Sequence, residues 1–374
     1  MASPNLTPYL ERLEALIDLD HVARTRELHR RAFAFEPVEH VPTVILYQAP
    51  DEEWPRFTSQ EIYDDPAKML LSQLHDVYVG AKLQDDRLYG IRADYGSGII
   101  ASIFGSPTAL VANSLPVGLA VTPDRLAAIL AGEPPPAIAD GAYRSLPLLS
   151  RAFDTVAYYR ETLRPYPKLA RAVGSQMLDI QGPFDNASII WGSAIFAALY
   201  EAPEQVVRLM EQVVDVTLAV VREHRRIDGC PLDEHDGAWQ MLGGLCVRND
   251  SSICVGPRHY RGLIRGCDER LLAPYGGWMH FCGRAAWWPD VLGIPNLRGI
   301  NPYQGEFYDL YSMYERCEAA RMSIVQWTKP LDRRCRERIR TGFSRIIWAA
   351  DYDAARRLVD RLHATGHADS EEEA

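Results

Sequence analysis

The feature that most constrains the fold of this 374-residue chain is a regular alternation of expected strands and helices. Runs of β-branched and apolar residues alternate with segments in which apolar residues recur at helical spacing. The expected strands cover 41–47, 89–94, 177–181, 239–247, 277–282, 297–301, 323–327 and 344–349. This alternation predicts a parallel sheet covered by helices. Eight units favour an α/β fold of the closed (β/α)8 TIM-type barrel, with an open doubly wound sheet as the alternative.

The chain is expected to form one barrel domain over residues 1–366. A basic amphipathic helix at about 20–35 forms an N-terminal extension. The less regular stretch at about 96–175 is interpreted as an insertion between early strands, with helices near 123–130 and 148–172. The acidic end of the chain, 367–374, is expected to be disordered, because short charged termini have little to pack against.

Composition and charge argue against a nucleic-acid-binding, membrane-bound or disulfide-rich protein. Hydrophobic residues make up 47% of the chain, which allows a large core, and the formal net charge of -10 disfavours binding to nucleic acid or anionic membranes. We find neither an apolar run long enough to cross a membrane nor a basic start followed by an apolar segment. The 7 cysteines are odd in number and form no CxxC pair, so a disulfide framework is not expected. These features predict a cytoplasmic protein with a small-molecule substrate.

Polar side chains follow the expected strands, where barrel enzymes place their chemistry. They are Asp94, Gln181, Asn249, Asp250, His280, Cys282, Asn301, Gln304, Glu306, Gln326 and Asp351. Among them, His280 and Cys282 are two positions apart on one expected strand, so their side chains point to the same side. Two metal ligands need this arrangement. The alternative is a hydrogen-bonded buried histidine beside a core cysteine.

Several segments, in this order, resemble the uroporphyrinogen decarboxylase superfamily. They are DIQGPFDNA at 179–187, LYEAPE at 199–204, NDSS at 249–252 with GPRHY at 256–260, HFCG at 280–283 and INP at 300–302. The superfamily includes porphyrinogen decarboxylases and methylcobalamin:coenzyme M methyltransferases. The arginine-rich motif of the decarboxylases is absent, and Arg24, Arg26 and Arg30 lie on an expected helix instead.

The resemblance implies a zinc site at His280 and Cys282, because zinc methyltransferases of this superfamily hold the metal with His-x-Cys at this strand end. The relatives' further cysteine near the last strand is missing here, which leaves Glu306 or Asp351 as the third ligand. Zn²⁺ is therefore the expected cofactor, and a corrinoid protein or a small methylated compound is the expected methyl donor. Relatives of this kind are monomers or homodimers.

Three functions remain open from the sequence. The first is zinc-dependent methyl transfer to a thiol or another soft nucleophile. The second is a metal-independent decarboxylase or lyase that protonates a carbanion-like centre through Asp94 or His280. The third is a non-catalytic barrel that binds a ligand or a corrinoid protein.

Within these functions, Asp94 and Asp250 are expected either to position substrate and move protons or to serve as turn and cap residues. The neutral side chains at the strand ends are expected to bind substrate or to satisfy loop backbone groups. They are Gln181, Asn249, Asn301, Gln304 and Gln326.

Overall fold

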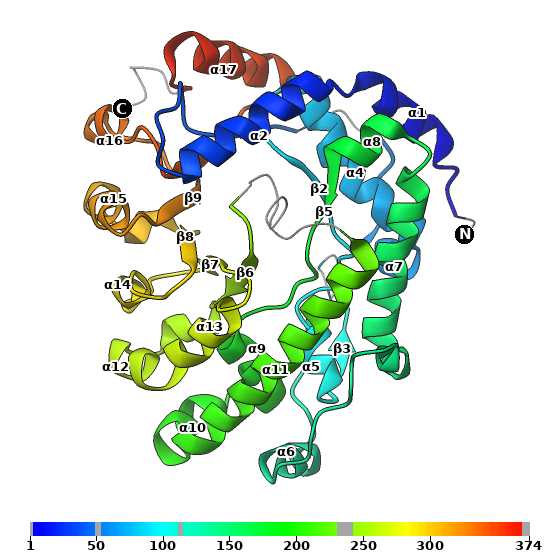
Figure 1. The fold of residues 1–374 in the computed structure, drawn as a ribbon, viewed down its shortest axis with the longest axis vertical. Helices are drawn as coiled ribbons and strands as arrows, with labels where there is room; N and C mark the ends of the chain where they lie inside the picture. Colours follow the sequence, from blue (N-terminus) through cyan, green and yellow to red (C-terminus); the bar gives the residue numbers. More distant parts are fainter. Residues whose placement is uncertain (1–2, 49–53, 111–113, 115, 230–241, 369–374) are drawn as a thin grey trace.

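The computed structural model describes residues 3–48, 54–110, 114, 116–229 and 242–368, and Figure 1 shows helices arranged outside the strands. Eight of the described strands are parallel. Six form one sheet, in the order β1 (Thr43–Leu46), β10 (Phe343–Trp348), β9 (Ser323–Trp327), β8 (Leu297–Pro302), β7 (Gly277–Phe281) and β6 (Leu245–Arg248). The other two are β2 (Tyr89–Ile91) and β5 (Val173–Ser175), which pair with each other. The first and last strands of the chain are thus neighbours in the larger sheet.

The expected closed eight-stranded ladder is not present among the described residues, because strand pairing is interrupted in two places. Between β1 and the segment leading into β2, one backbone bond joins Asp86 N–H to the carbonyl of Thr43 at 3.3 Å. Two further backbone N–H groups there donate to carboxylates: that of Ile45 to Asp85, and that of Thr43 to Asp86. On the other side, Gly182 N–H donates to the carbonyl of Arg248 at 2.7 Å. Side chains and single bonds therefore replace the ladder at both breaks.

Two strand predictions need correction. The strand expected at 177–181 lies instead at Val173–Ser175, and the chain after it continues without ladder pairing. The strand expected at 239–247 is β6, Leu245–Arg248, and residues 230–241, including Cys230 and Trp239, lie outside the described part. The other six expected strands are found within a few residues of their predicted positions.

The helices before β5 include the expected N-terminal extension. They are α1 (Thr7–Leu16), α2 (Leu19–Phe33), α3 (Ser59–Asp64), α4 (Pro66–Leu83), α5 (Ile99–Ile103), α6 (Pro123–Leu130), α7 (Pro147–Leu163) and α8 (Pro167–Ala172). The region expected as an insertion also holds a short antiparallel pair, β3 (Thr108–Ala109) and β4 (Val117–Gly118). Proline begins four of these helices, where its missing N–H has no intrahelical partner to lose.

The helices after β5 alternate with the strands of the larger sheet. They are α9 (Pro183–Trp191), α10 (Ile195–Glu201), α11 (Pro203–Asp228), α12 (Pro257–His259), α13 (Arg265–Leu272), α14 (Trp288–Val291), α15 (Leu310–Ala319), α16 (Arg333–Arg338) and α17 (Tyr352–Thr365). The longest, α11, buries an apolar stripe that includes Val206, Leu209 and Val213, and it ends at Gly229 in the left-handed conformation. No helix in the described ranges is both long and apolar enough to cross a membrane. Of the expected disordered tail, residues 369–374 lie outside the described part.

Candidate metal centre and adjoining pocket

The register of three neighbouring strands brings the central candidate residues together. His280 on β7 lies opposite Arg248 at the end of β6 and opposite Asn301 on β8. Cys282 follows β7 directly, and Asp250 lies two residues beyond the end of β6. Because parallel strands end at the same edge of a sheet, all five side chains lie at the carboxyl ends of the strands.

Asp250, His280 and Cys282 offer one ligand atom each, and these atoms all lie within 4.8 Å of one another. The Sγ of Cys282 is 3.3 Å from Nε2 of His280, and Oδ1 of Asp250 is 3.4 Å from the same nitrogen. Asp250 Oδ1 also accepts the backbone N–H of Cys282 at 2.7 Å. The group combines nitrogen, sulfur and oxygen donors, which are the three kinds of ligand atom that zinc takes in proteins.

Asn301 determines which nitrogen of His280 carries the proton. Its amide NH2 donates to the carbonyl of Val325 at 2.7 Å, so its Oδ1 faces Nδ1 of His280 at 2.6 Å and must accept from it. With Nδ1 protonated, the lone pair of the neutral ring is on Nε2, which faces Cys282 and Asp250. This arrangement, in which the second ring nitrogen of a ligand histidine is held by a neighbouring group, is typical of metal sites.

Burial controls the protonation of the two strand residues. It lowers the pKa of His280, although the negative charge of Asp250 and the bond to Asn301 oppose the shift, and the ring is neutral at physiological pH. Burial, followed by the negative charge of Asp250, raises the pKa of the Cys282 thiol to about 12. Without a metal, the thiol therefore keeps its proton.

A buried carboxylate holds the loop that carries Asp250. Asp185 on α9 accepts the backbone N–H of Asp250 at 2.7 Å and that of Ser251 at 2.5 Å. Its burial raises its pKa to about 7, and the nearby charge of Asp250 adds to the shift. Since Asp185 occupies these N–H groups, the carboxylate of Asp250 is directed toward Cys282 and His280 instead.

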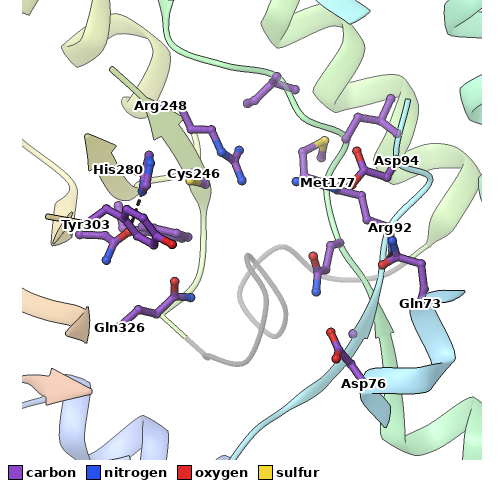
Figure 2. A pocket seen from close by; sticks show the side chains of 16 residues that line it. Gln73, Asp76, Arg92, Asp94, Met177, Cys246, Arg248, His280, Tyr303 and Gln326 are labelled. Atoms are coloured by element: carbon purple, nitrogen blue, oxygen red, sulfur yellow. Dashed lines mark hydrogen bonds and ion pairs between the residues drawn. The ribbon is translucent and has the colours of Figure 1, made fainter. Parts of the chain in front are cut away.

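A polar pocket of about 250 Å³ adjoins the group and shares His280 with it. Figure 2 shows His280, Arg248 and Tyr303 on one side, facing Arg92 and Asp94 on the other. Two lining arginines form ion pairs: Arg92 with Asp94, which also lines the pocket, at 2.8 Å, and Arg248 with Asp179 at 3.1 Å. Burial opposes ionisation of Asp179, but Arg248 and Arg92 outweigh it and hold the pKa of this carboxyl below its usual value.

Four of the predicted residues line this pocket: Asp94, His280, Asn301 and Gln326. Three other predicted residues do not line the pocket and form hydrogen bonds with neighbouring groups instead. Asn249 is fully buried and donates to Asp268 at 2.8 Å, Gln181 donates to Asp179, and Gln304 accepts the backbone N–H of Gly283.

The two residues expected as a third metal ligand are not part of the group. Glu306 pairs with Lys329 at 3.1 Å, and Asp351 caps α17 by accepting the N–H of Ala354 at 2.8 Å. The structure places Asp250 beside His280 and Cys282 instead.

The sequence predictions missed the two arginines of the pocket, Arg92 and Arg248, and the buried carboxylates of Asp179 and Asp185. A signal for one pair was present: in Arg92-x-Asp94, opposite charges two residues apart extend one side of the expected strand at 89–94. Charged residues on the inner side of a buried strand are rarely left unpaired, and they mark a polar interior.

No protein-family model matches this chain, and no curated protein does either. Among solved structures, the chain is similar to a methyltransferase from Methanosarcina mazei. The two share 12% sequence identity and superpose with a TM-score of 0.59, over 91% of this chain and 97% of the other. The likeness extends over nearly the whole of both chains, and at this identity it establishes a common fold.

Proposed function

We propose that this protein is a zinc-dependent methyltransferase that transfers a methyl group to a thiol or another soft nucleophile. The observation that carries the proposal is the convergence of Asp250, His280 and Cys282 at the carboxyl ends of two adjacent strands. The fold likeness to a methyltransferase and the sequence resemblance to the uroporphyrinogen decarboxylase superfamily support it. The closed barrel and the membership of that superfamily are part of the same proposal.

The donor set fits a catalytic zinc site, which takes three protein ligands and leaves one position for substrate. Zn²⁺ in this position would supply Lewis acidity that lowers the pKa of a substrate thiol. His280 would offer Nε2, because Asn301 holds Nδ1–H, and Cys282 would have to lose its proton on binding. Asp250 would supply the oxygen ligand and keep the Cys282 backbone in place.

The adjoining pocket would bind the rest of the acceptor. The guanidinium of Arg248 points into it, and Asp94 orients Arg92 on the opposite side, so a carboxylate or another anionic group of the substrate would find donors there (Figure 2). Gln326 would add a neutral hydrogen-bonding group.

A corrinoid protein is the methyl donor that best suits the exposed rim near the site. Tyr303, Phe307 and Trp348, close to the ends of β8 and β10, are exposed by 52%, 47% and 69%. Exposed aromatic side chains of this kind favour contact with a large partner over contact with a small methylated compound.

The same pocket supports a second candidate, a metal-independent decarboxylase or lyase for a small carboxylated substrate. The observation in its favour is the presence of Arg92 and Arg248 beside His280, which would bind the carboxylate next to a titratable group. This reaction would need neither Cys282 nor bound zinc.

Zinc content measured by mass spectrometry on untagged protein distinguishes the two candidates. Cys282→Ser should remove one equivalent of zinc per chain and abolish methyl transfer from methylcobalamin to thiols, while Cys254→Ser, an exposed cysteine outside the group, should change neither. Equal zinc content in the wild type and Cys282→Ser would overturn the methyltransferase proposal. Release of carbon dioxide from carboxylated substrates by both proteins would then support the lyase.

A further inference from the structure

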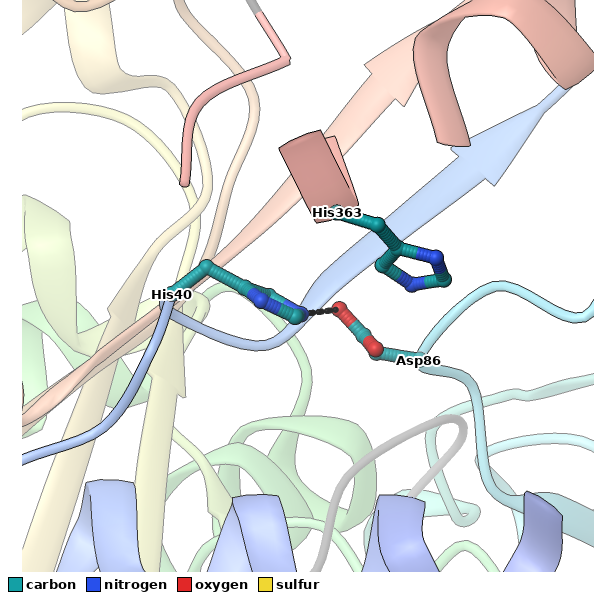
Figure 3. A group of neighbouring side chains, drawn as sticks. All are labelled: His40, Asp86 and His363. Atoms are coloured by element: carbon teal, nitrogen blue, oxygen red, sulfur yellow. Dashed lines mark hydrogen bonds and ion pairs between the residues drawn. The ribbon is translucent and has the colours of Figure 1, made fainter. Parts of the chain in front are cut away.

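A second group of metal-ligand side chains lies at the amino ends of the strands, away from the candidate site. Figure 3 shows His40, just before β1, beside Asp86, just before β2, and His363 in the last turn of α17. One ligand atom of each lies within 4.8 Å of the other two. Three distant parts of the sequence therefore meet at this point.

The ligand atoms of the group are close enough to one another to share one ion. His40 Nε2 is 3.0 Å from Asp86 Oδ2, and the rings of His40 and His363 have their centroids 5.6 Å apart. Two ligands that are each about 2.0–2.2 Å from a tetrahedral zinc ion lie roughly 3.3–3.6 Å from one another. The ligand-atom separations, 3.0 Å for His40 and Asp86 and within 4.8 Å for the others, bracket that spacing.

The surroundings hold Asp86 in position. Thr43 N–H donates to Asp86 Oδ2 at 2.9 Å, and His29 Nε2 contacts the Asp86 carbonyl at 2.7 Å. The side chains of His40 and Asp86 are only 9% and 5% exposed, whereas His363 is exposed. Within the described ranges, the His363 ring has no hydrogen-bond partner, so either of its nitrogens can carry the lone pair that binds a metal.

We propose that His40, Asp86 and His363 bind a second, structural Zn²⁺, with water as the fourth ligand. Two imidazoles and one carboxylate suit zinc, whereas Mg²⁺ and Ca²⁺ prefer all-oxygen sites. The exposed side of His363 gives access to water for the remaining position. This site is separate from the proposed methyl-transfer centre and does not depend on it.

The position of the group in the fold indicates a structural role. Asp86 lies at the break between β1 and β2, where a single backbone bond replaces the ladder. An ion bound here would join the segment before β1, the segment before β2 and the C-terminal helix α17. The amino ends of barrel strands serve stability, whereas the carboxyl ends carry the chemistry.

The test uses the Cys282→Ser protein, in which the proposed catalytic site is disabled. Zinc-loaded Cys282→Ser should retain one equivalent per chain, Cys282→Ser/His363→Ala should retain none, and Cys282→Ser/His259→Ala should again retain one. His259 contacts Tyr200 and belongs to neither group, so it is the matched histidine control. Zinc absent from Cys282→Ser, or retained in Cys282→Ser/His363→Ala, would overturn the second site. Equal zinc in the wild type and Cys282→Ser would instead count against the catalytic site.

A second readout separates binding from unfolding. Saturating zinc should raise the thermal midpoint of Cys282→Ser and leave that of Cys282→Ser/His363→Ala unchanged, because a metal stabilises only the fold that binds it. Removing an exposed ring should not unfold the chain in the absence of zinc. Co²⁺ bound to Cys282→Ser should show d–d absorption without a thiolate charge-transfer band. An equal zinc-induced shift in both proteins, or no shift in either, would contradict the proposal.

Discussion

Replacing Asn301 with alanine tests whether His280 is held ready as a metal ligand. Asn301 is only 1% exposed and bridges two groups, accepting from His280 Nδ1 at 2.6 Å and donating to the carbonyl of Val325 at 2.7 Å. Alanine removes both bonds and lets the His280 ring change tautomer or rotate. The three ligand side chains themselves stay unaltered.

Two separate losses are expected from this change. Loss of the hydrogen-bond partner that holds a ligand histidine lowers metal affinity by about 10–100-fold, equivalent to about 1.4–2.7 kcal/mol. The carbonyl of fully buried Val325 loses a donor as well, which costs about 1–3 kcal/mol of folding stability. Zinc affinity and stability should therefore fall together in Asn301→Ala.

Asn249→Ala is the matched control. Asn249 is also a buried asparagine near a strand end, but its side chain donates to Asp268 at 2.8 Å and not to His280. It should lose stability and keep wild-type zinc affinity. Zinc affinity is measured by competition with a chelator, and stability by denaturant unfolding of the metal-free proteins. If Asn301→Ala loses stability but binds zinc as tightly as Asn249→Ala, the role assigned to Asn301 is wrong.

Three further predictions concern protonation and buried charge. In metal-free protein at about pH 8, peptide mapping should show slower alkylation of Cys282 than of exposed Cys254, because a thiol with a pKa of about 12 is ionised only to roughly one part in ten thousand. Comparable rates would contradict this. For the same reason, the zinc affinity of the proposed site at Asp250, His280 and Cys282 should rise about tenfold per pH unit between about pH 6 and 8, since binding must displace the thiol proton. A flat profile by chelator competition would refute it. Arg87→Met should cost about 3–5 kcal/mol in denaturant unfolding, because its partner Asp85 is left charged and buried, the two side chains being 1% and 0% exposed. A loss below about 1 kcal/mol would indicate that the pair behaves like a surface ion pair.

Most strands could be predicted because their signal is local. β8, β9 and β10 are runs of apolar and β-branched residues with turn residues on either side. Such runs favour strand structure, so they can be recognised without knowing their partners. The prediction at 177–181 was wrong although Met177, Leu178 and Ile180 show a similar pattern. These residues line the pocket, and Gln181 has a positive φ of 52° that ends any extended run. Apolar character was visible in the sequence, but the absence of a pairing partner was not.

The breaks in the ladder could not be predicted from the sequence, because they also depend on which groups become hydrogen-bond partners in the folded chain. Asp85 and Asp86 precede a short strand, where aspartates are equally typical of a turn. Their carboxylates instead accept the backbone N–H groups of Ile45 and Thr43, which a neighbouring strand would otherwise satisfy. Whether a carboxylate or a carbonyl takes a given N–H depends on positions that only the folded chain sets.

His280 and Cys282 could be predicted as a pair from the sequence, and the third member of the candidate group could not. His280 is on β7 and Cys282 follows the strand directly, so a spacing of two residues places both side chains on one side, with Sγ 3.3 Å from Nε2. Asp250 comes from the neighbouring strand, and its place depends on the register in which Arg248 lies opposite His280. A shift of one residue in that register would turn the loop side chains away from the site.

Asp250 and Asp351 also show why the same residue type at two strand ends has two different functions. α17 begins immediately after Asp351, so its free N–H groups take that carboxylate as a cap, with the Ala354 N–H bound at 2.8 Å. After β6, the N–H groups of Asp250 and Ser251 are already satisfied by the buried carboxylate of Asp185. Because Asp185 supplies the acceptor from another helix, the side chain of Asp250 makes no cap and is left to face Cys282 and His280. The candidate ligand group is therefore positioned by α9 as much as by β6 and β7.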